Sequence, residues 1–105
     1  MKTSCHVNIS EWTKIKNINL SPNQIYTLII DYPFGWNDRG YDFRIKTGPN
    51  GKTTVDIINE IVKAYNKIYK DPDKYGVFGH GIEDLNLSEI SVNHARKIIK
   101  IGVDS

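Results

Sequence analysis

The sequence predicts an α+β fold in which a mainly antiparallel sheet of about five strands packs on one long helix. Several short segments alternate apolar and polar residues, as half-buried strands do. One long segment repeats apolar residues every three or four positions, which is typical of an amphipathic helix. Strands and helices do not alternate along the chain, which disfavours a parallel sheet. With 105 residues, 39% of them apolar, the chain fits a single α+β domain, residues 1–105.

The first half of the chain supplies the strands that precede the helix. Apolar and polar residues alternate over residues 5–9, which predicts a half-buried strand, and residues 12–22 are mixed, with Ile18 and Leu20 alternating with Asn17 and Asn19. Residues 24–31 are apolar on both faces and rich in β-branched side chains, which favours a central strand. Residues 41–46 alternate with period two and predict a strand with one solvated face. Two β-turns are predicted, at residues 21–23 and 48–51.

A helix is predicted to begin near Thr53, which with Asp56 three residues later matches a capping box. It ends at Asp71-Pro72, because the residue before a proline avoids helical geometry. Six apolar or aromatic residues share one stripe and are expected to face the sheet. They are Ile58, Ile61, Val62, Tyr65, Ile68 and Tyr69.

Two more strands follow the helix. Residues 85–92 change phase at Ser88-Glu89, and a β-bulge there would keep the apolar residues on one face. Asn93-His94 is predicted as a two-residue turn, and residues 96–103 as the closing strand with Ile99, Ile101 and Val103 inward. A hairpin, a helix and two further strands is also the order of β-grasp domains, so the fold resembles that class at the level of topology.

Between the helix and these strands lies a glycine-dense loop. The segment Tyr-Gly-Val-Phe-Gly-His at residues 75–80, followed by Asp84, resembles one in small uncharacterised α+β proteins of fungi, amoebae and amoebal giant viruses. This resemblance implies no activity and no catalytic residue. The role of the loop stays open between a ligand loop and a simple chain reversal. Its candidate residues are Gly79, His80, Gly81 and Asp84.

Composition excludes several classes of protein. No apolar run reaches 18 residues and no secretory leader is seen, so we expect an intracellular protein, cytoplasmic or nuclear, or one in a virion or host cell if it is viral. One cysteine leaves neither an intramolecular disulfide nor a cysteine-rich zinc site. No catalytic motif occurs, and we expect no enzyme, cofactor or metal, although a small enzyme centred on His80 stays an alternative.

Residues 48–53, Gly-Pro-Asn-Gly-Lys-Thr, resemble the end of a phosphate-binding loop. That pattern needs a glycine where this chain has Lys46, so fewer backbone N–H groups would converge on a phosphate. We therefore interpret the segment as a turn followed by a helix cap, and we expect no nucleotide.

The leading functional hypothesis is a non-enzymatic interaction module. The long loop at residues 32–41 carries aromatic residues and an arginine, the types enriched at binding hot spots. The loop, or an unpaired sheet edge, would meet a protein partner or a second copy in a homodimer. In the alternative reading the aromatic residues fold back over one end of the sheet. The candidate protein-binding residues are Phe34, Trp36, Arg39 and Tyr41.

The second hypothesis is a nucleic-acid-binding accessory or transcription-regulatory protein. The formal net charge is +2 and the pI is about 8.6, which permits a polyanionic partner without indicating one. Basic residues on the predicted strands and on the exposed helix face would contact phosphates, although such a row is often only solvated. The candidates are Arg39, Arg44, Lys46, Lys52, Lys63, Lys67 and Lys70.

Overall fold

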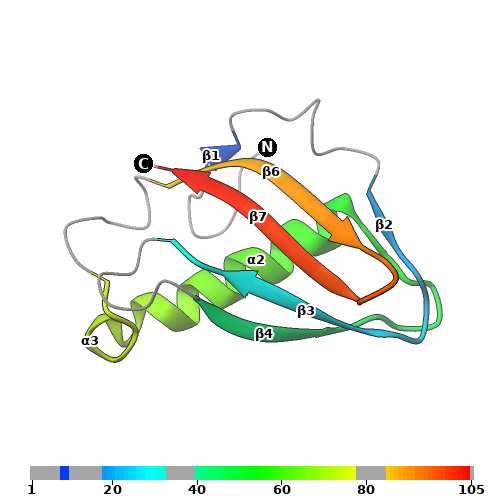
Figure 1. Ribbon diagram of the computed structural model, residues 1–105, viewed down its shortest axis with the longest axis horizontal. Helices are drawn as coiled ribbons and strands as arrows, with labels where there is room; N and C mark the ends of the chain where they lie inside the picture. The colour runs from blue at the N-terminus through cyan, green and yellow to red at the C-terminus, as the bar shows by residue number, and fades with distance from the viewer. Residues whose placement is uncertain (1–7, 10–17, 33–39, 78–84, 105) are drawn as a thin grey trace.

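The computed structural model describes residues 8–9, 18–32, 40–77 and 85–104. They form a five-stranded sheet in the order β1-β6-β7-β3-β4 and a two-stranded sheet, β2-β5, and helix α2 lies across one face of the larger sheet (Figure 1). The α+β class and the long helix are confirmed. The strands are β1 (Asn8–Ile9), β2 (Asn19–Leu20), β3 (Ile25–Ile30), β4 (Tyr41–Lys46), β5 (Lys52–Thr53), β6 (Asn86–Asn93) and β7 (Ile98–Asp104). The helices are α2 (Thr54–Tyr69) and α3 (Pro72–Tyr75).

Most paired residues of the larger sheet are antiparallel, as the sequence predicts, but the sheet is mixed because two of its pairings are parallel. The hairpins β3-β4 and β6-β7 are antiparallel, but β3-β7 and β1-β6 are parallel. The reason is topological: α2 joins β4 on one edge to β6 on the far side, so the two hairpins meet through β3 and β7. These two central strands run in the same direction, with Thr27 beside Ile98 and Ile29 beside Lys100.

The strands before the helix follow the predicted pattern. β3 is central, with Tyr26, Leu28 and Ile30 fully buried towards α2. In β4 the side chains of Asp42 and Arg44 are exposed, in the alternation the sequence predicts. Of the strand predicted at residues 5–9, only residues 8 and 9 lie within the described part of the chain, and they form β1.

Both predicted turns are present. Asn23 has a positive φ of 57° in the first, and in the second the Gly51 N–H donates to the Gly48 carbonyl at 3.1 Å. The buried Thr47 hydroxyl joins the two turns, because it accepts from the Gln24 N–H at 2.8 Å and donates to the Ser21 carbonyl at 2.7 Å. Two short turns at one end of the hairpin are thereby fixed to each other.

Helix α2 begins at the predicted cap. The Thr53 N–H and hydroxyl both donate to the Asp56 carboxylate, at 3.0 and 3.1 Å. The backbone hydrogen bond from Thr53 holds the pKa of Asp56 below its usual value, because it stabilises the charged carboxylate. Lys70 caps the other end, one residue before the predicted stop at Asp71-Pro72.

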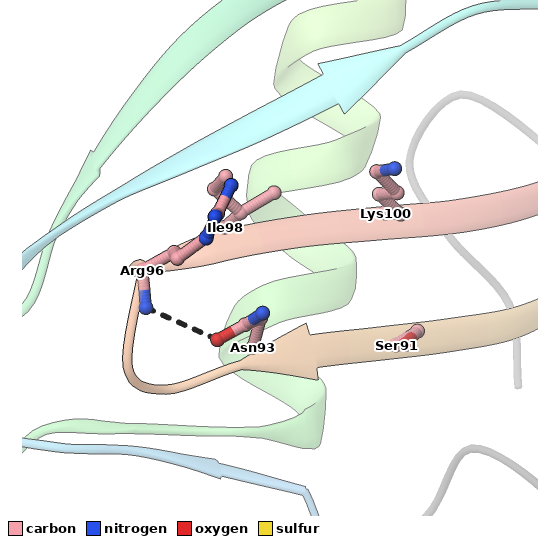
Figure 2. Close-up of a pocket in the computed structure, with 5 residues that line it drawn as sticks. All are labelled: Ser91, Asn93, Arg96, Ile98 and Lys100. Carbon is pink, nitrogen blue, oxygen red and sulfur yellow. Dashed lines mark hydrogen bonds between the residues drawn. The ribbon is translucent and has the colours of Figure 1, made fainter.

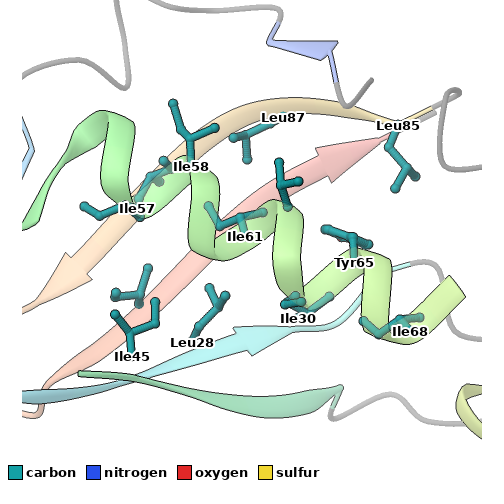
Figure 3. Close-up of a cluster of buried hydrophobic side chains, with 14 of the residues drawn as sticks. Leu28, Ile30, Ile45, Ile57, Ile58, Ile61, Tyr65, Ile68, Leu85 and Leu87 are labelled. Atoms are coloured by element: carbon teal, nitrogen blue, oxygen red, sulfur yellow. The ribbon is translucent and has the colours of Figure 1, made fainter. Parts of the chain in front are cut away.

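The core lies between α2 and the sheet (Figure 3). Five of the six predicted stripe residues are buried and the sixth, Tyr69, is half-buried, so the amphipathic helix is confirmed. Ile57 and Ala64 widen the buried face beyond the predicted stripe. The Tyr65 hydroxyl donates to the Tyr32 carbonyl at 2.8 Å. Burial raises the pKa of Tyr65 above its usual range, with smaller contributions from Tyr69, Asp31 and Tyr32.

The predicted bulge in β6 is also confirmed. The register of β6 against β7 shifts between Leu87 and Glu89. Leu87 and Ile90 are three positions apart, so in a regular strand they would point to opposite faces. The extra residue of the bulge keeps both of them buried on the same face.

The β6-β7 connection corrects the sequence prediction of a two-residue turn at Asn93-His94 and a strand starting at Arg96. β6 continues to Asn93, which pairs with Ile98, and residues 94–97 form the turn. The Asn93 side chain favours this longer turn because its Oδ1 accepts the Arg96 N–H at 3.1 Å, and Lys97 closes it with a φ of 58°. Ile99 is buried, as predicted, while Ile101 and Val103 are half-buried.

Two small features were not predicted. After Pro72 the chain forms α3, which ends at Gly76 in the left-handed conformation. β2 pairs with β5 just before α2, and the Thr54 hydroxyl accepts the Ile18 N–H at 2.7 Å there. Within the described residues, neither helix has the length and apolar character needed to cross a membrane.

Candidate functional site

Three of the four candidate protein-binding residues lie outside the described residues, namely Phe34, Trp36 and Arg39. Tyr41 is described and half-buried. Its hydroxyl donates to the Tyr75 carbonyl at 3.3 Å, and its ring meets the Tyr75 ring edge-on at 4.8 Å between centroids. Tyr41 therefore packs this end of β4 onto α3.

The loop residues Gly79, His80, Gly81 and Asp84 also lie outside the described part of the chain. Among the residues that are described, no three His, Cys, Asp or Glu side chains come close enough to hold a metal ion.

The predicted basic residues are divided between two surfaces. Arg44 and Lys46 are exposed on the open face, by which we mean the face of the larger sheet that α2 does not cover. Lys63 and Lys67 on α2 and Lys70 at its C-terminal cap are exposed on the other side of the sheet. A single flat surface therefore does not include all of them. Arg39 lies outside the described residues.

Lys52 belongs to neither surface. It is half-buried and pairs with Glu60 at 3.6 Å, and Glu60 also pairs with Lys63 at 3.5 Å. The segment that resembles a phosphate loop thus forms a tight turn, the short strand β5 and a helix cap, with its lysine held by a carboxylate.

The outer side of β4 is the clearest candidate for an interaction site. The Thr47 N–H donates to the Gln24 carbonyl at 2.9 Å, so residues 41, 43, 45 and 47 turn their backbone groups towards β3. By the alternation of an antiparallel ladder, the N–H and C=O groups of Asp42, Arg44 and Lys46 point away from β3. No strand among the described residues pairs with that side.

A shallow groove of about 290 Å³ runs between β4 and α2 beside this edge. Its floor is apolar and includes the half-buried Phe43 and the buried Ala64. Its helix side carries Glu60, Lys63 and Lys67, and the Lys67 ammonium lies 6.0 Å from the centroid of the Phe43 ring. Strand side chains that point to this side would therefore meet an apolar surface whose helix side carries two lysines and one glutamate.

Sequence reasoning missed two basic residues on the open face, Arg96 and Lys100, which are both exposed. The alternation of Lys100 with Ile99 and Ile101 was the available signal. Together with Ser91, Asn93 and Ile98 they line a hollow on the β6-β7 hairpin (Figure 2).

Comparison with known proteins gives no assignment, because no family model, curated protein or solved structure matches the chain.

Proposed function

We propose that the protein is a non-enzymatic interaction module that self-associates through the outer side of β4. The observation that carries this proposal is a six-residue strand with one unpaired side within the described residues. Unpaired N–H and C=O groups at a sheet edge form a ready template for another strand. The edge contains neither proline nor a bulge, two devices that commonly prevent such pairing.

The residue order of β4 makes it complementary to a second copy of itself. In an antiparallel pair with its two-fold axis at Phe43, each Asp42 lies opposite the partner's Arg44. Opposite charges in such positions contribute about 0.2 to 1 kcal/mol per pair. On the groove side the two half-buried Phe43 rings lie opposite each other and lose exposed surface.

Other charges limit the strength of this association. Lys63 and Lys67 line the groove of each copy, so two approaching helices bring like charges together. One strand pair also buries less surface than a standard interface. We therefore expect a dissociation constant in the micromolar range or weaker.

Charge reversal tests the proposal in the purified protein. The full chain is examined by sedimentation equilibrium from micromolar to millimolar concentration. Asp42→Arg and Arg44→Asp each place like charges opposite each other, so each variant alone is expected to be monomeric. An equimolar mixture of the two restores both charge pairs and is expected to form a heterodimer. Lys46→Glu, at the next outward position on β4, is the control and should keep the dimer.

Three outcomes would overturn the proposal. They are a wild-type protein that stays monomeric at millimolar concentration, single variants that dimerise as the wild type does, and a mixture that fails to associate. Unchanged circular dichroism of the variants excludes misfolding as the cause.

We also propose that the described sheet and helix form a β-grasp arrangement. The supporting features are the two hairpins, their parallel central strands β3 and β7, and α2 across one face. Nuclear Overhauser contacts between Thr27 and Ile98 across β3 and β7 test this pairing, and their absence would rule it out.

Nucleic-acid binding is the second candidate function. Four basic residues on or beside the open face favour it, namely Arg44, Lys46, Arg96 and Lys100. Binding to a single-stranded oligonucleotide should then weaken linearly in a plot of log affinity against log salt. Removing one phosphate contact, as in Arg44→Gln, reduces that slope by roughly 0.7 to 0.9, whereas Lys70→Gln on the far side leaves it unchanged. Affinity that does not respond to salt would remove this candidate.

A further inference from the structure

The hollow on the open face of the β6-β7 hairpin collects hydrogen-bond donors. It has a volume of about 280 Å³ and is lined by Ser91, Asn93, Arg96, Ile98 and Lys100. Ser91 lies directly opposite Lys100 and Asn93 opposite Ile98 in the β6-β7 ladder, so these four side chains share one face. Figure 2 looks onto this face, with α2 behind the strands.

The polar side chains that line it suit an anion. Arg96 offers a planar fork of N–H donors, and Lys100 offers an ammonium group. The Asn93 Oδ1 is already occupied by the Arg96 N–H at 3.1 Å, which leaves the amide NH₂ to donate outward. The Ser91 hydroxyl adds another donor, and none of the residues that line the hollow is acidic.

The turn that carries Arg96 is held on several sides. The Lys97 carbonyl accepts the Thr27 N–H at 2.7 Å, and the Lys97 ammonium donates to the His94 carbonyl at 2.9 Å. His94 Nδ1 is hydrogen bonded to the Tyr26 hydroxyl at 3.1 Å, and Tyr26 is fully buried. A backbone fixed in this way needs little further ordering when a ligand binds.

Within the described residues, no carboxylate forms an ion pair with Arg96 or Lys100. In the sheet register Asp42 and Lys100 lie on opposite sides of β3, so their Cα atoms are two strand spacings apart, about 10 Å. Glu89 pairs with Gly102 and is the diagonal neighbour of Lys100, the closest competing acid in the register.

We infer that this hollow binds a phosphate group, either as inorganic phosphate or as a phosphate monoester. Arg96, in the turn, donates two hydrogen bonds to two phosphate oxygens, and Lys100, on β7, supplies a second positive charge. Ser91 and Asn93 donate to the remaining oxygens. Ile98 forms an apolar floor. The site is separate from the β4 edge, so it goes beyond the proposed self-association.

The test is a titration of the ¹⁵N-labelled full chain, followed by amide chemical shifts. The probes are inorganic phosphate, phosphoserine, and sodium chloride at matched ionic strength. Phosphate is expected to shift the amides of Ser91, Asn93, Arg96 and Lys100 in a saturable manner, with a dissociation constant of about 1 mM. Tighter binding of phosphoserine than of phosphate identifies a monoester as the natural form, and equal binding identifies the free ion.

Matched variants separate this site from general charge effects. Lys100→Gln and Arg96→Gln are each expected to weaken phosphate binding at least fivefold. Lys46→Gln removes another exposed strand lysine of the open face, outside the hollow, and should leave the affinity unchanged. Identical shifts with chloride, or equal weakening by the Lys46 variant, would overturn the inference. Binding only to an oligonucleotide without a terminal phosphate would also overturn it, in favour of the nucleic-acid candidate.

Discussion

Replacing Gly51 with alanine should destabilise the protein far more than the same change at Gly48 in the same turn. Gly51 has a φ of 70°, in the left-handed region, where a residue with a Cβ atom costs about 1 to 2 kcal/mol. A Cβ built there would also collide with the Leu20 carbonyl oxygen. Leu20 is 3% exposed and pairs with Lys52, so relief of the collision disturbs both the core and the β2-β5 pairing.

The magnitude follows from these two contributions. Strain and a displaced core strand together should lower the free energy of unfolding by about 2 to 4 kcal/mol for Gly51→Ala, a large share of a typical 5 to 15 kcal/mol. Gly48 has no positive φ, and a Cβ there meets no atom within 4 Å. Gly48→Ala should therefore be neutral or stabilise by up to about 1 kcal/mol, through the unfolded chain.

Urea unfolding followed by circular dichroism measures the difference. We expect the midpoint of Gly51→Ala to fall clearly below that of the wild type, with an unchanged slope, and that of Gly48→Ala to stay near it. In thermal unfolding the loss corresponds to a fall of roughly 10 to 20 °C for a domain of this size. Equal stabilities of the two variants, within about 0.5 kcal/mol, would refute the assigned backbone strain and with it the geometry of the turn that leads from β4 to α2.

Three further predictions concern α2. Ile61 is 1% exposed, so Ile61→Ala should lower the free energy of unfolding in urea by about 2 to 5 kcal/mol. Asn66→Ala, on the exposed face of the helix, should change it by less than about 0.5 kcal/mol. Similar effects of the two substitutions would contradict the assigned faces of α2. The folded state raises the pKa of Tyr65, so the stability contributed by its neutral phenol is complete below about pH 10 and is lost above about pH 10, by up to about 1.4 kcal/mol per pH unit. Tyr65→Phe should therefore lose less stability at alkaline pH than the wild type. An unchanged slope of stability against pH would count against the burial of Tyr65. The folded state lowers the pKa of Asp56, so its carboxylate stabilises the fold above about pH 4, and this stabilisation is lost as the pH falls through the pKa of the folded state. Asp56→Asn should therefore lose less stability on acidification than the wild type. An equal loss would contradict the helix cap.

Features encoded by neighbouring residues were predictable. The helix stripe, the capping pair Thr53 and Asp56, and the phase change at Ser88 each involve residues close in the sequence, and each is confirmed. The parallel pairing of β3 with β7 joins residues about 70 positions apart, so no local pattern specifies it. The four-residue turn at residues 94–97 was missed because its left-handed position is occupied by Lys97, without a glycine to mark it.

The candidate site was predictable only in its residue types. The sequence identified Arg44 and Lys46 as exposed strand residues, but it could not show that β4 is an edge strand, because strand order depends on which hairpins meet. For the same reason it could not bring Arg96 together with Lys100 and Ser91, which lie on two strands. Pairing between strands, rather than the pattern within each strand, decides which side chains share a face.

The outer side of β4 can be examined most directly by residue-resolved amide hydrogen exchange at low and high protein concentration. In dilute protein, the amides of Asp42 and Arg44 should exchange rapidly while those of Phe43 and Ile45, bonded to β3, are protected. At millimolar concentration Asp42 and Arg44 should become protected, as they pair with a second copy. Protection of both amides in the dilute protein, or rapid exchange of both where the protein sediments as a dimer, would contradict the account.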